Sequence, residues 1–388
     1  MINHFIFQSV TRIEFGTGVT VKAGEEAGAL GMKKCLIVTD PGVVKAGLLD
    51  PIVSSLERSG CEHAVYDQVV PNPRIETIQA GVEVYRKAGV DGIIAIGGGS
   101  SIDAAKAIGI VINNGGTIDM YEYGRKPIAR GIPPLIAIPT TTGTGSEVTP
   151  WAVITNPSRE DKMDVGDGTT ASSPTLALVD PELTKTLPPD ITAATGADAL
   201  THAIEGYTSW TATPMSDILN LAAIKIIAKA LRPAVAGGEC MSSRLDMLYG
   251  STLAGLGFSN SSCGLVHAMA QKLGGVFDLP HGVANAIFLP DVMEFNLIAC
   301  PDRFGVIAEA MQEYVDGLSP MDAARLAVVA VRKLFEEIGI PKLKDLKIDP
   351  KRFDDIALGS LNYLDAKGNA RPATARDTKT ILQKVYQA

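Results

Sequence analysis

Several features are scarce in this 388-residue sequence, and each shortage argues against a class of protein. Acidic side chains outnumber basic ones and leave a formal net charge of −8. The chain therefore lacks the excess of Lys and Arg that nucleic acids and anionic membrane surfaces attract. Its five cysteines are scattered and form no CxxC pair, which favours a reduced environment over a disulfide framework.

Long apolar runs are also missing. No run approaches the ~20 residues that a membrane span needs. The N-terminal stretch MINHFIFQSVTRIEFG lacks the charged and apolar regions of a signal peptide. From these shortages we expect a cytoplasmic protein whose partners are neither nucleic acids nor membranes.

The order of apolar runs and helical patterns divides the chain into two halves. In the first half the short apolar runs KKCLIVTD, GIIAIGGG, PPLIAIPTT and TLALVDP alternate with amphipathic helical patterns. This alternation is typical of a parallel sheet that is covered on both faces. In the second half nearly every segment repeats at the helical period. We predict an α/β domain over residues 1–185 and an all-helical domain over residues 186–388, with the boundary near LPPDITAATG.

Two loops and one acidic residue in the first half suggest a nucleotide site. AIGGGSSIDAAKAIG places three glycines between a strand and a helix, where free N–H groups attract an anion. IPTTTGTGSEVT is rich in hydroxyl groups and follows the next predicted strand. Asp40 ends the strand in LIVTD, the place where an acid accepts hydrogen bonds from the ribose of NAD. Together these features favour a bound dinucleotide over simple tight turns.

Histidines are few, and three of the five lie in the helical half. In GADALTHAIEGY, Asp198 and His202 are one helical turn apart and share a face. Taken alone, this pair could be a carboxylate that orients a structural histidine. His267 and His281 also lie in helical segments among small or apolar residues. One Asp and three His suit Fe²⁺ or Zn²⁺ and suit Ca²⁺ poorly, which favours a metal site.

These motifs resemble the iron-containing (group III) alcohol dehydrogenases along essentially the whole chain. The resemblance rests on GGGSSIDAAKAIG, PTTTGTGSEVT, TAATGADALTHAIEGY and the pair GLVHAMAQKLGG and LPHGVANAIFLP. It implies a Rossmann-like NAD-binding α/β domain, a helical metal-binding domain, and a homodimer or higher homo-oligomer.

The resemblance also implies roles for individual residues. The metal ligands, which take part in catalysis through the metal, would be Asp198, His202, His267 and His281. The residues that contact NAD(H) would be Asp40, Asn72, Gly98, Gly99, Ser100, Thr140, Thr141, Thr144, Ser146, Lys162 and Val179. Trp151 and Phe258 would line the substrate pocket. The chain departs from the family pattern at Gln271, where many members have a histidine that can relay a proton. Its GNARPAT also departs from the common G-N-P-R pattern.

We therefore expect a metal-dependent NAD(H) oxidoreductase, with Fe²⁺, Zn²⁺ or another divalent metal, that interconverts a small primary alcohol and its aldehyde. An anionic pair such as isethionate and sulfoacetaldehyde stays open, with Lys272 or Arg371 to bind the anion. Two alternatives also stay open. One is a glycerol-dehydrogenase-like polyol dehydrogenase, and the other is a non-catalytic sensor that binds NAD or a metal.

Overall fold

The computed structural model describes residues 4–388, and its contacts divide these residues into two compact units. The first unit is Gln8–Leu187. The second is Pro188–Ala388, to which residues 4–7 belong. The chain passes from one unit to the other inside the stretch LPPDITAATG. Within the described residues, no helix is both long and apolar enough to cross a membrane.

The first unit contains a six-stranded sheet in which every pair of neighbouring strands is parallel. In spatial order its strands are β1 (Arg12–Phe15), β8 (Leu176–Val179), β5 (Leu135–Pro139), β4 (Gly92–Gly97), β2 (Lys34–Val38) and β3 (Glu62–Tyr66). A separate antiparallel hairpin consists of β6 (Ala152–Asn156) and β7 (Asp161–Val165). The four strands predicted from apolar runs are confirmed as β2, β4, β5 and β8. The prediction did not include β1, β3 or the hairpin, whose residues are less uniformly apolar.

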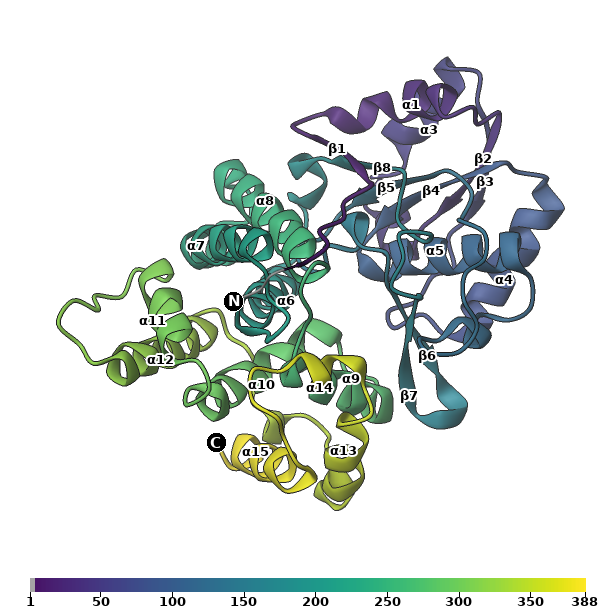
Figure 1. Cartoon of the computed structure of the whole chain (residues 1–388). Coiled ribbons are helices and arrows are strands. Elements are labelled where there is room, and N and C mark those ends of the chain that lie inside the picture. The colour runs from purple at the N-terminus through teal and green to yellow at the C-terminus, as the bar shows by residue number, and fades with distance from the viewer. Residues whose placement is uncertain (1–3) are drawn as a thin grey trace. The chain divides into compact units, whose positions relative to one another are not determined.

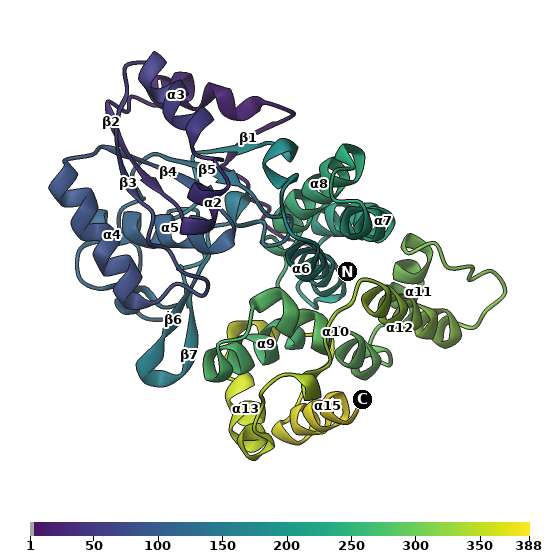
Figure 2. The same cartoon turned by 180° about the vertical axis from the view of Figure 1, so that it is seen from behind.

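Helices lie on both faces of this sheet (Figures 1 and 2). They are α1 (Ala23–Ala29), α2 (Pro41–Lys45), α3 (Asp50–Arg58), α4 (Ile75–Ala88) and α5 (Gly99–Asn114). Alternate residues of one strand enter different cores, as side chains on a strand point alternately to its two faces. Leu36 of β2 packs in the core that contains α4 and α5, whereas Ile37 packs in the core that contains α1 and α3. Burial on both faces explains why these strands are continuous apolar runs.

The strand order contains a switch point between β2 and β4. The chain runs from β2 outward to β3 and then returns to β4 on the other side of β2. In open α/β sheets, ligands bind beyond the carboxyl ends of the strands at such a point. Asp40 follows β2 and Gly98 follows β4, so the topology places both residues there.

The second unit is helical and has one large apolar core. Its long helices are α6 (Pro189–Thr208), α7 (Pro214–Ala236), α8 (Met241–Phe258), α9 (Leu265–Phe277), α10 (His281–Asn296), α11 (Pro301–Ala310), α12 (Pro320–Glu337) and α15 (Ala375–Gln387), and its short ones are α13 (Phe353–Ser360) and α14 (Leu364–Gly368). Every residue of α6 from Gly196 to Thr208 is buried. A Cβ atom on Gly196 would lie 2.3 Å from Leu231 of α7, so the small residues of α6 let its neighbours approach closely.

Candidate metal centre and cofactor loops

Three helices of the second unit bring four metal-ligating side chains together. Asp198 and His202 lie one turn apart on the buried face of α6. His267 is in the first turn of α9, and His281 is the first residue of α10. Each residue offers one ligand atom, and these four atoms all lie within 4.8 Å of one another. Residues separated by up to 83 positions of sequence (281 − 198) are therefore neighbours in the fold.

The four side chains surround a small volume that is largely shielded from water. Asp198, His202 and His267 are buried, and His281 is about a quarter exposed at its side chain. Asp198 Oδ1 lies 3.9 Å from Nε2 of His267 and 3.8 Å from Nε2 of His281. The ring of His202 lies 4.5 Å, centroid to centroid, from the ring of His267. Such a set of one carboxylate and three imidazoles suits Fe²⁺ or Zn²⁺.

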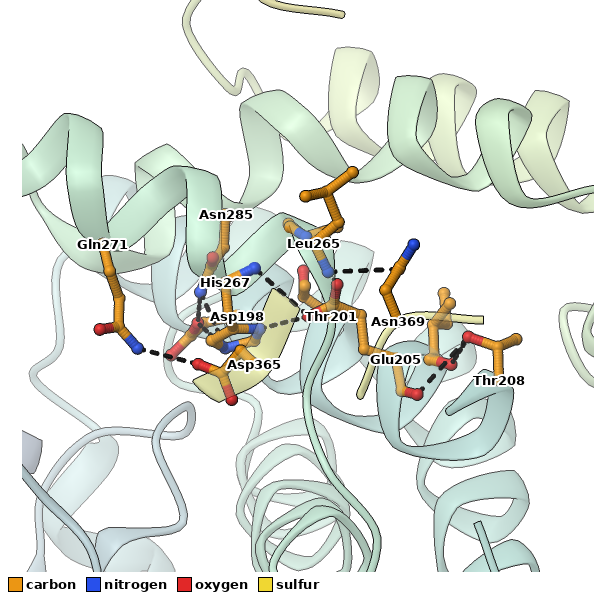
Figure 3. A network of polar contacts seen from close by, with 12 residues as sticks. Asp198, Thr201, Glu205, Thr208, Leu265, His267, Gln271, Asn285, Asp365 and Asn369 are labelled. Carbon is orange, nitrogen blue, oxygen red and sulfur yellow. Dashed lines mark hydrogen bonds and ion pairs between the residues drawn. The ribbon is translucent and has the colours of Figure 1, made fainter. Parts of the chain in front are cut away.

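The contacts of the Asn285 side-chain amide indicate whether these groups fit a cation (Figure 3). Asn285 Nδ2 lies 2.6 Å from Asp198 Oδ1, 3.1 Å from His267 Nε2 and 3.2 Å from His281 Nε2. One donor nitrogen thus faces three groups that can act as acceptors. The amide oxygen of Asn285 is buried and makes no hydrogen bond to a described residue. The acceptors therefore converge on one point that takes a partial positive charge, which is what a cation site requires.

Neighbouring charges shift the pKa values of two residues of the centre. Burial alone would raise the pKa of Asp198, but the charges of His202, His281 and His267 outweigh it and lower that pKa. Burial likewise opposes a charged His267. The hydrogen bond to Glu205 and the charges of Glu205 and Asp198 outweigh that effect and raise the pKa of His267 to about 9. A carboxylate at this depth needs positive charge beside it.

Three residues beside the centre were not singled out from the sequence. Glu205 contacts His267, Asn285 contacts three of the four ligands, and Asp365 of α14 accepts a 3.0 Å hydrogen bond from Nε2 of Gln271 (Figure 3). Helical spacing could have indicated Glu205, since residues 198, 202 and 205 share one face. The same helical spacing could have indicated Asn285, which lies one turn after His281. Asp365 lies 94 residues after Gln271, and no local pattern points to it.

The two predicted pocket residues lie in different units. Phe258, at the end of α8, stacks on His202 with ring centroids 4.3 Å apart and planes 12° apart. It therefore places an apolar surface beside the metal-ligand cluster. Trp151 belongs to the α/β unit, where its ring packs against Tyr123 and over Gly166. A pocket role for both residues stays a prediction.

The two predicted cofactor loops pack closely on each other in the α/β unit. A Cβ on Gly98 would lie 3.2 Å from Thr141, and a Cβ on Gly99 would lie 2.5 Å from Thr144. Glycine is therefore needed at residue 99 for the loops to approach each other. Thr140 N donates to Gly97 O at 2.9 Å and extends the pairing of β4 and β5 into the loop. Ser100 follows in the first turn of α5, where N–H groups face the end of the sheet.

Asp40 has a structural task at the same edge. One oxygen of its carboxylate accepts hydrogen bonds from Gly42 N at 2.9 Å and Val43 N at 3.1 Å, which caps α2. The other oxygen accepts from Ser101 Oγ at 3.2 Å. The carboxylate thus links the loop after β2 to the helix after β4. A contact with the ribose of NAD stays a prediction for this residue.

The remaining predicted cofactor residues fall into three groups. Lys162 Nζ donates to Asn72 Oδ1 at 2.7 Å, so the structure brings together the two residues expected on the nicotinamide side. Val179 is fully buried in β8, paired in register with Phe15. Ser146 is buried, donates to Asp103 Oδ1 at 2.5 Å and accepts from Lys106 Nζ at 2.7 Å. The side chain of Ser146 therefore makes its hydrogen bonds to residues inside the α/β unit.

The sequences of both units match descriptions of one protein family. Residues 10–181 match "Iron-containing alcohol dehydrogenase", and residues 192–386 match "Fe-containing alcohol dehydrogenase family, C-terminal". A 1,3-propanediol dehydrogenase of Citrobacter freundii is 42% identical over 376 residues, which covers 96% of each chain.

Solved structures agree with these matches along the whole chain. A crystal structure of a 1,3-propanediol oxidoreductase superposes with a TM-score of 0.94 at 39% identity and covers 99% of this chain and 100% of that one. The sulfoacetaldehyde reductase of Bifidobacterium kashiwanohense, solved in complex with NAD⁺, gives a TM-score of 0.88 at 30% identity, with 99% of each chain covered.

Proposed function

Since this chain belongs to the iron-containing alcohol dehydrogenase family, we propose that it interconverts a short, uncharged primary alcohol and its aldehyde. It is a metal-dependent alcohol or aldehyde oxidoreductase, and its cofactors are NAD(H) and Fe²⁺. The convergence of Asp198, His202, His267 and His281 on one point carries the proposal for the site. Bound there, the divalent metal supplies a Lewis acid that polarises the substrate oxygen.

The chain's own residues would hold and orient the reactants. The four ligands come from three packed helices, so their positions are set by the core of the helical unit. In the α/β unit, the glycine loop offers N–H groups to the pyrophosphate of the dinucleotide. Lys162 and Asn72, which are already joined, would contact its nicotinamide side. Hydride transfer itself belongs to the cofactor, and the protein contributes position and electrostatics.

An uncharged substrate is favoured by the charges near the centre. Asp365 brings a carboxylate to Gln271, beside the metal ligands. Arg371, one of the two candidate anion partners, stacks on Phe295 and donates to the carbonyl of Phe295 at 2.9 Å. The stem of Lys272, the other candidate, packs at Gly359. The aromatic ring of Phe258 adds an apolar wall. We therefore place aldehydes of about two to four carbons ahead of sulfoacetaldehyde.

A panel of substrates tests this proposal. The enzyme is loaded with Fe²⁺ without oxygen, and the fall in NADH absorbance is followed with short neutral aldehydes, dihydroxyacetone and sulfoacetaldehyde. The highest kcat/KM is expected for a neutral aldehyde. A highest value for dihydroxyacetone would establish the polyol alternative, and one for sulfoacetaldehyde would establish the anionic alternative. A cytoplasmic location and a homo-oligomer stay predictions, the second of which sedimentation analysis would check.

A further inference from the structure

Glu205 is a buried carboxylate that lies beside the metal ligands without belonging to them. It is on α6, one turn after His202, and 4% of its surface is exposed. Its Oε2 lies 2.5 Å from Nδ1 of His267. Its Oε1 accepts a 2.7 Å hydrogen bond from the backbone N–H of Val266. Both oxygens are therefore engaged with the start of α9.

The start of α9 depends on this side chain for a cap. The N-cap residue of α9, Gly264, makes no side-chain capping bond. The N–H groups of the first turn would otherwise lack partners in a buried place. Glu205 accepts from Val266 N, and Asn369 Oδ1 accepts from Leu265 N at 3.2 Å. A Cβ on Gly264 would lie only 2.7 Å from Glu205 Oε1, so a glycine at this position leaves room for the carboxylate.

The same carboxylate determines which nitrogen of His267 faces the centre. An ionised carboxylate accepts hydrogen bonds and donates none, so Nδ1 of His267 carries the proton that it shares with Glu205. Nε2 then points the other way, toward Asn285 Nδ2 at 3.1 Å and Asp198 Oδ1 at 3.9 Å. Metal-bound histidines commonly donate their second N–H to such a carboxylate, which orients the ring and makes the ligand nitrogen more basic.

We propose that Glu205 is a positioning residue of the metal centre, which holds His267 with Nε2 directed at the metal while it caps α9. This proposal rests on the proposed metal centre. Glu205 does not itself ligate the metal. Glu205, Cys263 and His267 form a second group of possible ligands whose atoms lie within 4.8 Å, but Nδ1 of His267 is already occupied by Glu205 in that group.

The test is the affinity of the protein for Zn²⁺, measured by competition with a chromogenic chelator. In Glu205→Gln an amide replaces the carboxylate. When the amide oxygen accepts from Val266 N, the amide NH₂ faces Nδ1, and the proton of His267 must move to Nε2, where it blocks the metal. The dissociation constant for Zn²⁺ should rise about 10- to 100-fold. An affinity within about twofold of the wild type would overturn the proposal.

Asn369→Ala is the matched control, because Asn369 caps the same helix end through the N–H of Leu265, whereas Glu205 also bonds to the ring of His267. It should lower the melting temperature of the metal-free protein and leave the Zn²⁺ affinity within about threefold of the wild type. If Asn369→Ala weakens Zn²⁺ binding as much as Glu205→Gln does, Glu205 acts only as a helix cap and the proposal is wrong. Cys263→Ser should retain the wild-type affinity, and a loss there would assign the metal to the second group instead.

A measurement on the unaltered chain guards against a variant that fails to fold. In the Zn²⁺-loaded protein, ¹⁵N NMR of the histidine rings should show Nδ1 of His267 protonated and Nε2 bound to the metal. The reverse assignment would overturn the proposal. Absence of Zn²⁺ binding by the wild type would overturn the proposed metal centre as well, so the two failures are distinguishable.

Discussion

Each unit of this protein contains a cluster of buried polar side chains next to a predicted site, and the two clusters differ in their balance of donors and acceptors. In the α/β unit, Lys106 is fully buried and donates to Ser146 Oγ and to the carbonyl of Trp151, each at 2.7 Å. Asp103 lies 3.8 Å from the same ammonium group and accepts from Ser146 and from Val153 N. We call this the complete cluster, because the ammonium group and the Asp103 carboxylate both have hydrogen-bond partners in it, and buried Glu147 adds a second negative charge.

The cluster in the helical unit has a different balance of hydrogen-bond donors and acceptors. Asp198 and the facing nitrogens of two imidazoles have one amide group, that of Asn285, as their common donor. With the imidazoles neutral, as metal ligation requires, this buried set of acceptors costs free energy unless a cation joins it. Burial of polar residues therefore does not by itself mark a functional site. The cluster in the α/β unit supports the architecture, whereas the converging acceptors of the helical unit could hold a cation, the receptor role that we propose for them.

The pKa values show the cost of even the complete cluster. Burial lowers the pKa of Lys106 to about 8, although the charges of Asp103 and Glu147 act in the opposite direction. Burial also raises the pKa of Asp103 against the charge of Lys106. Desolvation therefore outweighs the attraction of the pair. Such a pair adds little net stability, but the loss of one partner leaves the other charge uncompensated.

Removal of one ligand should give the largest effect of all. His281→Ala deletes an imidazole that is partly exposed, so the core of the helical unit is spared. Loss of the metal's charge stabilisation, worth several kcal/mol, should lower kcat about a thousandfold. Activity, bound metal and melting temperature are measured together. Near-normal turnover in metal-free protein would contradict the receptor role of this cluster. His267→Ala is a poorer choice, since it would remove the imidazole that bonds to the buried carboxylate of Glu205.

A break in the complete cluster should affect stability and leave metal binding alone. Lys106→Met removes the ammonium group and leaves Asp103 buried without its counter-charge, which should cost about 3 kcal/mol in the free energy of unfolding. The addition of Asp103→Asn should recover part of this loss, because the two changes act on one pair. Denaturant unfolding and Zn²⁺ affinity are the measurements. A large fall in Zn²⁺ affinity would mean that the two clusters are not separate in function.

Cofactor preference should show a smaller effect that depends on Asp40 alone. The carboxylate would repel the 2′-phosphate of NADPH at a cost of several kcal/mol, so the wild type should prefer NADH about a hundredfold or more. Asp40→Asn keeps an oxygen to cap α2 but removes the charge, and it should narrow the preference to about tenfold through better use of NADPH. The ratio of kcat/KM for the two cofactors is measured with one aldehyde. A wild type that uses both equally refutes the ribose role of Asp40.

The smallest effect on kcat is expected at Gln271, where the chain departs from the family pattern. Gln271→His places a titratable ring where Gln271 Nε2 now donates to Asp365. The neighbouring carboxylate should raise the pKa of the new ring above its usual ~6.5. If this position relays a proton, the pH–rate profile of kcat should gain an ionisation near neutrality, with a change in kcat below about tenfold. The same substitution together with Asp365→Asn should move that ionisation to lower pH. An unchanged profile in both variants would mean that protons leave by another path.

Local sequence patterns predicted the elements that are buried uniformly. The apolar runs of β2, β4, β5 and β8 were predicted because both faces of these strands are buried. The antiparallel hairpin was not predicted, because it lacks such uniform apolar runs. Its strand β7, DKMDV, mixes charged and apolar residues, and a single sequence does not distinguish it from a loop. Gln271 was noted as an unusual residue, but its partner Asp365 was not, because contacts between distant segments leave no local pattern.

Sequence patterns predicted the class of fold, and the resemblance of the motifs to a known family supplied the family and the four candidate metal ligands. Periodicity is a local property, so the class of fold could be predicted without knowledge of tertiary contacts. Tertiary contacts were needed to show that Asn285 contacts three of the four candidate ligands, that Glu205 contacts His267, and that Ser146 and Lys106 belong to a polar cluster in the other unit. The physical reason is that hydrogen bonding and desolvation depend on distances of a few ångströms between side chains, and packing of whole helices and strands sets those distances.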